Sequence, residues 1–100
     1  IRGGENIYPG EIEQAAYEMP AVREVVVFGE PDHAMGEELV MVAHPAPGEQ
    51  QEADTLRSFL KERLAGYKVP RAIVISDTPL PRNASEKLHK LKVKEAYLEA

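Results

Sequence analysis

Two apolar runs, Val25-Val26-Val27-Phe28 and Leu39-Val40-Met41-Val42-Ala43, decide the fold of this 100-residue chain. Both runs are apolar throughout, and the first is dominated by the β-branched residue valine, so each predicts a buried strand. Pro31 and Gly36 lie between the runs and suit a hairpin-like connection, because proline and glycine interrupt regular structure. The sequence therefore predicts two buried strands joined by a short turn.

A helix is expected before these strands. Its apolar residues recur at i, i+3, i+4 and i+7, which is the spacing of one helix face; they are Ile12, Ala15, Ala16 and Met19. Pro9 suits the first helical position, and Glu11 and Glu13 suit the first turn, where carboxylates interact favourably with the helix dipole. We expect Pro20 to end this helix.

A second helix is expected after the strands. Its apolar face consists of Leu56, Phe59, Leu60 and Leu64. Asp54 or Thr55 can accept a hydrogen bond at its N-terminus as the capping residue. Gly66 is placed to end it at the C-terminus.

A third strand and a third helix complete the pattern. Ala72-Ile73-Val74-Ile75 predicts the strand, and Pro79 and Pro81 predict an extended passage after it. The final helix is marked by Leu88, Leu91, Glu95 and Leu98, with Val93 outside that face. The expected fold is α+β, a small three-stranded sheet packed with helices in the order loop-α-β-β-α-β-α. We expect the helices on one side of the sheet.

Length and composition exclude several classes of protein. One hundred residues suit one domain, and the lack of cysteine excludes disulfides, thiolate metal sites and a cysteine nucleophile. No apolar run approaches the roughly 20 residues that cross a bilayer, and no signal peptide is evident, so we expect a cytoplasmic protein without a transmembrane segment. His33, His44 and His89 lack the spacing of metal ligands, so no metal site is expected. The chain begins with Ile1, inside an apparent motif, which suggests a portion of something longer.

The charge is acidic overall and unevenly distributed. The net charge of −5 argues against a nucleic-acid binder. Residues 1–81 hold 7 Lys and Arg against 14 Asp and Glu, whereas residues 82–100 hold 5 against 3. The basic excess is either a solvated helix face or an anion site with Lys87 at its tip.

Two longer motifs lie near the ends of the chain. The first reads Gly3-Gly4-Glu5-Asn6-Ile7-Tyr8-Pro9-Gly10-Glu11-Ile12-Glu13, and the second reads Pro79-Leu80-Pro81-Arg82-Asn83-Ala84-Ser85-Glu86-Lys87-Leu88-His89-Lys90. By mechanism alone, the first is a glycine loop that feeds a helix and lets the backbone approach a ligand closely. The second places a lysine after a short polar loop.

Together these motifs resemble the C-terminal domain of the acyl-CoA synthetase and adenylate-forming (AMP-binding) enzyme superfamily. Gly29-Glu30-Pro31-Asp32 with Gly36-Glu37, and Leu64-Ala65-Gly66-Tyr67-Lys68-Val69-Pro70, fit the family in order and spacing. The resemblance covers nearly the whole chain. It implies that residues 1–100 are the single mobile C-terminal domain of an ATP-dependent acyl- or aryl-CoA ligase. The large N-terminal adenylating domain would then be its partner.

The resemblance also implies a chemistry. A carboxylic acid and ATP would give acyl-AMP, and CoA would then displace AMP, with Mg²⁺, ATP and CoA bound mainly by the large domain. The lysine corresponding to Lys87 contacts the substrate carboxylate and the α-phosphate during the first step, so Lys87 is the expected catalytic residue. The isolated chain is expected to be inactive.

The glycine loop carries the other expected site residues. By resemblance, Gly3, Gly4 and Glu5 line the tunnel for the pantetheine arm of CoA, and Asn6 lies near the nucleotide. Tyr67 and Lys68, in contrast, are expected to anchor the entrance to the third strand.

Glu86 departs from the family pattern, which usually has glycine before the lysine. Glutamate there could pair with Lys87, repel ATP or help to cap the final helix. Two alternatives stay open at this point. Ile1-Arg2-Gly3 also suits a carrier-protein-loading adenylation domain, and Glu86 suits a non-catalytic binding module that kept the fold.

Overall fold

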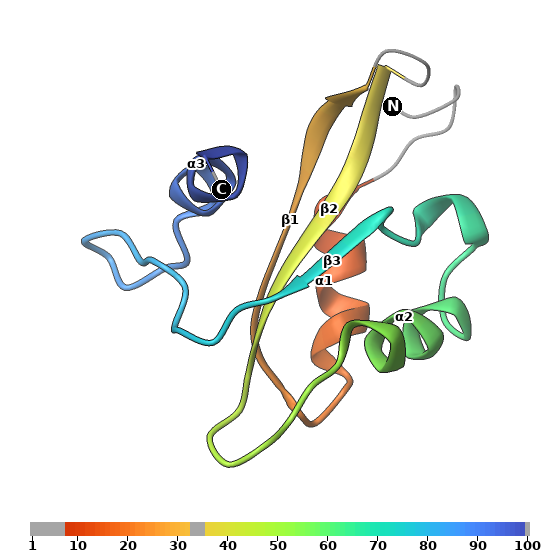
Figure 1. Cartoon of the computed structure of the whole chain (residues 1–100), viewed down its shortest axis with the longest axis horizontal. Coiled ribbons are helices and arrows are strands. Elements are labelled where there is room, and N and C mark those ends of the chain that lie inside the picture. Colours follow the sequence, from red (N-terminus) through yellow and green to blue (C-terminus); the bar gives the residue numbers. More distant parts are fainter. Residues whose placement is uncertain (1–7, 33–35, 100) are drawn as a thin grey trace.

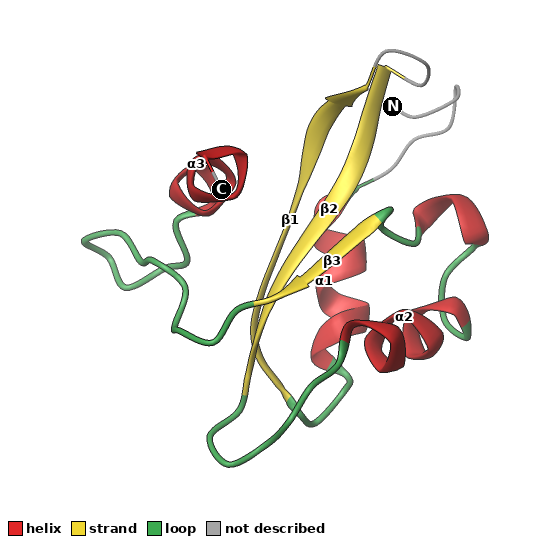
Figure 2. Cartoon of the chain, viewed as in Figure 1, coloured by secondary structure: helices red, strands yellow, loops and turns green. Residues whose placement is uncertain are grey.

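The computed structural model describes residues 8–32 and 36–99, and it has the expected α+β architecture (Figure 2). The elements, in chain order, are α1 (Pro9–Tyr17), β1 (Val22–Asp32), β2 (Gly36–Pro45), α2 (Ala53–Lys61), the 3₁₀ helix η1 (Gly66–Lys68), β3 (Ala72–Ile75) and α3 (Lys90–Glu99). The predicted order α-β-β-α-β-α is confirmed.

The sheet is mixed, with β2 at its centre. β1 is antiparallel to β2, with pairing that runs to Asp32 opposite Gly36, and β3 is parallel to β2 on its other side. The predicted hairpin is confirmed, although β1 continues past Gly29 and through Pro31. The N–H groups of Val25 and Val27 point away from β2, and Pro31 is an even number of residues further along the same strand. The backbone nitrogen of Pro31 therefore also points away from β2, so its lack of an N–H group removes no hydrogen bond from the sheet.

Helices cover both faces of the sheet, so the prediction of helices on one side is wrong (Figure 1). One face packs on α1 and α2. The core between this face and the two helices consists of Ile12, Ala15, Ala16, Val22, Val25, Val27, Leu39, Met41, Ala43, Leu56, Leu60 and Ile73. The other face lies under α3, and its buried residues are Val26, Phe28, Val40, Val42, Leu80 and Val93. The reason is the continuous apolar character of the two runs, which points apolar side chains to both faces.

A β-bulge at Arg23 sets which residues of β1 face which layer. Val22 pairs with Pro45 and Glu24 with His44, so two steps along β1 match one step along β2. The extra residue reverses which side chains of β1 point to which face of the sheet. Val22 therefore joins the core under α1 and α2, while Glu24 points to the face of α3.

Side chains from α1 satisfy two outward N–H groups of the edge strand β1. A carboxylate oxygen of Glu13 accepts from the N–H of Val27 at 2.8 Å, and the hydroxyl of Tyr17 accepts from the N–H of Val25 at 3.2 Å. Glu13 and Tyr17 are four residues apart, which is a rise of about 6 Å along a helix, and Val25 and Val27 are two residues apart, which is about 6.6 Å along a strand. The spacing of the two acceptors therefore matches that of the two donors. Glu13 therefore caps a strand edge, whereas only Glu11 lies in the first turn of α1 as predicted.

The ends of α2 differ from the prediction. The helix starts at Ala53 after Glu52, which makes no side-chain capping bond, so Asp54 and Thr55 lie inside the first turn. Gly66 begins η1 rather than ending α2. The buried stripe of Leu56 and Leu60 is confirmed.

Tertiary contacts hold the segment between α2 and β3. Arg57 donates to the carbonyls of Pro70 and Arg71 at 2.6 and 3.1 Å. Lys68 pairs with both carboxylate oxygens of Glu11 at 3.1 Å, which supports its expected role in anchoring the entrance to β3.

The buried face of α3 is the opposite of the predicted one. Val93 is 4% exposed, whereas Leu91 and Leu98 are 60% and 52% exposed. Tyr97, one turn after Val93, meets the ring of Phe28 edge-on with centroids 5.5 Å apart. This aromatic contact and the burial of Val93 decide how α3 lies on the sheet.

Val93→Ala should therefore destabilise the chain, while Leu91→Ala should not. Val93→Ala removes two buried methyl groups, which corresponds to a loss of about 1.5 kcal/mol of unfolding free energy. The exposed Leu91→Ala should stay within about 0.5 kcal/mol of the unchanged chain. Urea unfolding of both variants measures this, and a larger loss for Leu91→Ala would contradict the observed orientation of α3.

Candidate functional site

Lys87 lies on the exposed loop that joins β3 to α3. Within residues 8–32 and 36–99, its ammonium group makes no hydrogen bond or ion pair. Glu86, beside it, is exposed too, and the two side chains do not pair. Lys87 thus presents a solvated cation that can meet an anion from outside this part of the chain.

The backbone around Lys87 forms a closed, hairpin-like loop. Arg82 and Leu88 form an antiparallel bridge, and the N–H of His89 donates to the carbonyl of Pro81 at 2.9 Å. At the tip, the N–H of Glu86 donates to the carbonyl of Asn83 at 3.0 Å, which closes a turn. The segment is thus held at its base and at its tip.

Asn83 holds both backbone polar groups of Lys87. Its N–H donates to the Lys87 carbonyl at 2.8 Å, and its side-chain Oδ1 accepts from the Lys87 N–H at 3.1 Å. The same Oδ1 accepts from the N–H of Ser85 at 2.9 Å. No role was predicted for Asn83, although an asparagine at the start of a turn is a usable sequence signal for this bonding.

Glu86 occupies a backbone conformation that favours glycine. Its φ is +66°, and it is the one non-glycine residue with positive φ in the described part of the chain. A turn followed by a left-handed residue is a common loop between paired segments, and glycine fits that residue at least cost. Because α3 begins at Lys90, Glu86 lies outside its first turn, and the suggested capping role is wrong.

His89 caps α3 instead. Its Nδ1 accepts a hydrogen bond from the N–H of Lys92 at 3.2 Å, three residues into the helix. Lys90, the first residue of α3, pairs with Glu13 of α1 at 3.1 Å. These contacts fix the exit of the Lys87 loop.

A buried carboxylate fixes the entry of the loop. Glu24, 4% exposed on β1, accepts the N–H of Leu80 at 2.8 Å and a guanidinium nitrogen of Arg82 at 2.6 Å. Burial by itself raises the pKa of Glu24. The hydrogen bonds from Leu80 and Arg82, with the electrostatic effects of Arg82 and His44, together lower that pKa below its ordinary value. Glu24 is therefore held as a carboxylate.

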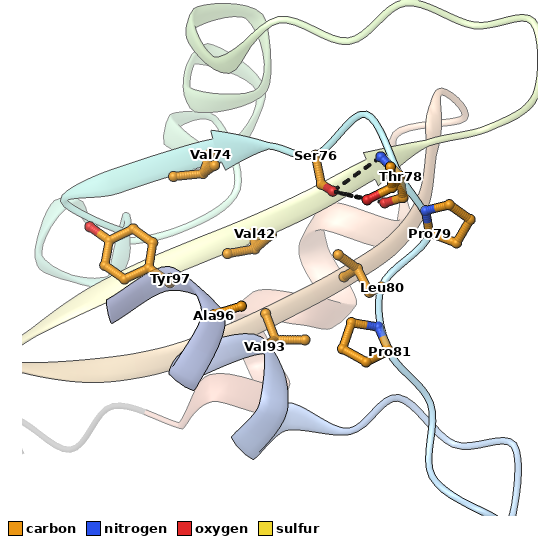
Figure 3. A pocket seen from close by; sticks show the side chains of 10 residues that line it. All are labelled: Val42, Val74, Ser76, Thr78, Pro79, Leu80, Pro81, Val93, Ala96 and Tyr97. Atoms are coloured by element: carbon orange, nitrogen blue, oxygen red, sulfur yellow. Dashed lines mark hydrogen bonds between the residues drawn. The ribbon is translucent and has the colours of Figure 1, made fainter. Parts of the chain in front are cut away.

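A groove between α3 and the sheet is separate from this loop tip (Figure 3). Its volume is about 280 Å³, and its lining residues are Val42, Val74, Ser76, Thr78, Pro79, Leu80, Pro81, Val93, Ala96 and Tyr97. The Ser76 hydroxyl donates to the Thr78 carbonyl at 2.7 Å. The groove is mostly apolar, and neither Lys87 nor Asn83 lines it.

Residues 8–32 and 36–99 contain no group of three or more His, Cys, Asp or Glu side chains that could hold a metal ion. They also contain no helix long and apolar enough to cross a membrane.

The sequence model of the AMP-binding enzyme C-terminal domain matches residues 11–87, which include both β1 and the Lys87 loop. The chain belongs to this family. The match ends at Lys87, so the lysine of the closing motif lies inside it while α3 lies beyond it.

Relatives of this AMP-binding C-terminal domain include CoA ligases. The feruloyl-CoA synthase of Amycolatopsis sp. is 42% identical over 97 residues, which are 97% of this chain and 20% of that protein. Human mitochondrial medium-chain acyl-CoA ligase ACSF2 is 39% identical over 95 residues, covering 95% of this chain and 15% of that protein. The chain thus spans a fifth or less of the length of these relatives.

A solved structure has the same fold. ATP-bound MatB from Rhodopseudomonas palustris superposes with a TM-score of 0.87 at 34% identity, over 97% of this chain and 19% of that one.

The expected pantetheine and nucleotide residues lie outside the described part of the domain. They are Gly3, Gly4, Glu5 and Asn6. Their assignment stays a prediction, and of the expected site residues the structure places Lys87 alone.

Glu86→Gly should stabilise the domain. Glycine removes about 1–2 kcal/mol of left-handed backbone cost, partly offset by about 0.5–1 kcal/mol from its freer unfolded state. We expect a gain of roughly 0.5–1 kcal/mol in urea or thermal unfolding. Glu86→Ala is the matched control, because it removes the charge but keeps a Cβ at positive φ. Equal stabilisation by both variants would show that charge, not backbone conformation, is the cause.

Proposed function

We propose that this chain is the mobile C-terminal domain of an ATP-dependent acyl- or aryl-CoA ligase. The observation that carries the proposal is Lys87, a solvated cation whose backbone is fixed by Asn83 at an exposed loop tip. Family membership and the CoA ligase relatives support the proposal. The large adenylating domain of the same enzyme would be the partner of this surface.

In the first half-reaction, a substrate carboxylate attacks the α-phosphate of ATP, giving acyl-AMP and pyrophosphate. Negative charge develops on the phosphate oxygens as the new bond forms. A lysine ammonium placed beside those oxygens stabilises this charge, and it does so best when its position is fixed in advance. Lys87 supplies that cation, and no group among residues 8–32 and 36–99 occupies its donors. The ATP-bound MatB relative is consistent with ATP as the nucleotide.

In the second half-reaction, the thiol of CoA displaces AMP from acyl-AMP. The domain would rotate between the two steps, withdrawing Lys87 and bringing the glycine loop to the site. Gly3 and Gly4 would leave room for the pantetheine arm, with Glu5 beside it and Asn6 near the nucleotide. One domain then completes the active site in two stages. Mg²⁺ would accompany ATP, held mainly by the large domain.

The acceptor distinguishes this proposal from its nearest alternative, a carrier-protein-loading adenylation domain. The relatives are named as CoA ligases, which favours CoA. Comparison of free CoA with a holo carrier protein as acceptor decides between them. Cytoplasmic location stays a prediction, since the human relative is named as mitochondrial.

The geometry of the Lys87 loop supports a catalytic domain over the non-catalytic alternative. Glu86 adopts the left-handed position of the loop, and Asn83 holds both backbone polar groups of Lys87. This fixed arrangement supports a catalytic role for the loop.

Lys87→Ala in the full-length enzyme should lower adenylation by about 10²-fold or more, the scale for removing one preorganised electrostatic contact. ATP–pyrophosphate exchange measures this step. Conversion of supplied acyl-AMP and CoA should persist, because Lys87 has left the site by then. Equal losses in both half-reactions would refute the division of roles, and unchanged exchange would refute the role of Lys87.

Gly4→Leu should give the opposite pattern. A leucine side chain would fill space that the pantetheine arm needs, so thioester formation should fall while pyrophosphate exchange persists. A melting curve controls for loss of the fold. Normal thioester formation by a folded variant would show that the glycine loop does not line the CoA tunnel.

A further inference from the structure

We propose that Glu24 and Arg82 are positioning residues for Lys87. Together they hold the Lys87 loop in the geometry that adenylation requires. The inference rests on the proposed function and assigns a role to a carboxylate more than 60 residues before the lysine. Neither residue would touch the substrate.

The first argument is the place of Glu24 in the fold. It points to the same face of the sheet as Val26 and Phe28, which are core residues, and it is only 4% exposed. Burial of a carboxylate is costly unless its oxygens are hydrogen-bonded. Its two described hydrogen bonds both go to the segment that leads to Lys87, at Leu80 and Arg82. Both hydrogen bonds of this buried charge are therefore made with the segment that leads to Lys87.

The second argument is the geometry of Arg82. One terminal nitrogen donates to Glu24 at 2.6 Å, and the other donates to the carbonyl of Glu86 at 2.7 Å. A guanidinium can bridge two acceptors in this way because its donors form a rigid, planar fork. Arg82 thus links the strand β1 directly to the residue before Lys87.

The third argument is the lack of apolar support at the loop tip. Residues 81–87 are all exposed, and buried apolar contact begins only with Leu80 on one side. Without a core to pack on, the loop depends on polar contacts for a single conformation. Glu24, Arg82 and Asn83 supply these contacts in sequence, ending at both backbone groups of Lys87.

A rigid loop matters because the domain would deliver Lys87 to a site on another domain. A misplacement of about 1 Å can lower a rate by about 10²-fold. Loosening the loop should therefore reduce adenylation while leaving the step that follows withdrawal of Lys87 unchanged.

The test uses Glu24→Gln and Arg82→Lys in the full-length enzyme. Glutamine keeps an oxygen for the N–H of Leu80 but loses the charge, and lysine keeps the charge but loses the fork. Glu18→Gln is the matched control, because it removes the carboxylate charge from the 2.9 Å pair of Glu18 with Arg63, away from the loop. We expect adenylation kcat to fall about 10- to 100-fold in the two test variants. The control and the conversion of acyl-AMP with CoA should be unchanged.

Combination with Lys87→Ala separates positioning from a general structural role. If Glu24 acts through Lys87, Glu24→Gln should cause no further loss of adenylation in the Lys87→Ala background. A multiplicative loss there, or equal losses in both half-reactions, would overturn the proposal.

Amide hydrogen exchange of this 100-residue chain gives a readout that does not depend on activity. Glu24→Gln should raise the exchange rates of Leu80 and Lys87 at least tenfold while the β1–β2 ladder stays protected. Unchanged exchange at Lys87 would overturn the positioning role. If Lys87→Ala leaves adenylation intact, the proposed function fails, and faster exchange would still support Glu24 as the residue that holds the loop.

Discussion

The apolar character of both faces of the sheet is the constraint on which this structure depends. β2 lies between two strands and has buried side chains on both sides, so one layer of helices cannot cover it. The chain must therefore pass from the face of α1 and α2 to the opposite face after β3. The extended segment with Pro79 and Pro81 makes this passage. The Lys87 loop follows it in the chain and precedes α3, which covers the second face (Figure 1).

The sequence predicted the elements well and their partners less well. Apolar spacing located both buried stripes and all three strands, because that spacing depends on local geometry. The buried face of α3 was missed because Leu91 and Leu98 are more apolar by type than Tyr97, whereas Phe28 on β1 selects Tyr97 as its neighbour. The bulge at Arg23 was also missed, since continuous apolar runs conceal a change in alternation.

In the candidate site too, residues identified by neighbouring sequence could be predicted, whereas residues that act through contacts distant in sequence could not. Lys87 could be found from its motif, and the turn around it from the asparagine that begins it. Glu24 could not, because a glutamate between Arg23 and Val25 resembles an exposed strand residue until the fold places Leu80 and Arg82 against it. Glu13 is similar, since its bond to Val27 arises from the placement of α1 along the edge of β1.

The backbone conformation of Glu86 depends both on neighbouring residues of the loop and on Glu24, which is distant in sequence. Its positive φ costs about 1–2 kcal/mol for a residue with a Cβ, so contacts nearby must maintain it. Its N–H and carbonyl are held by Asn83 and Arg82, and Arg82 is in turn held by Glu24. The backbone conformation that favours glycine is therefore imposed by the surrounding hydrogen bonds.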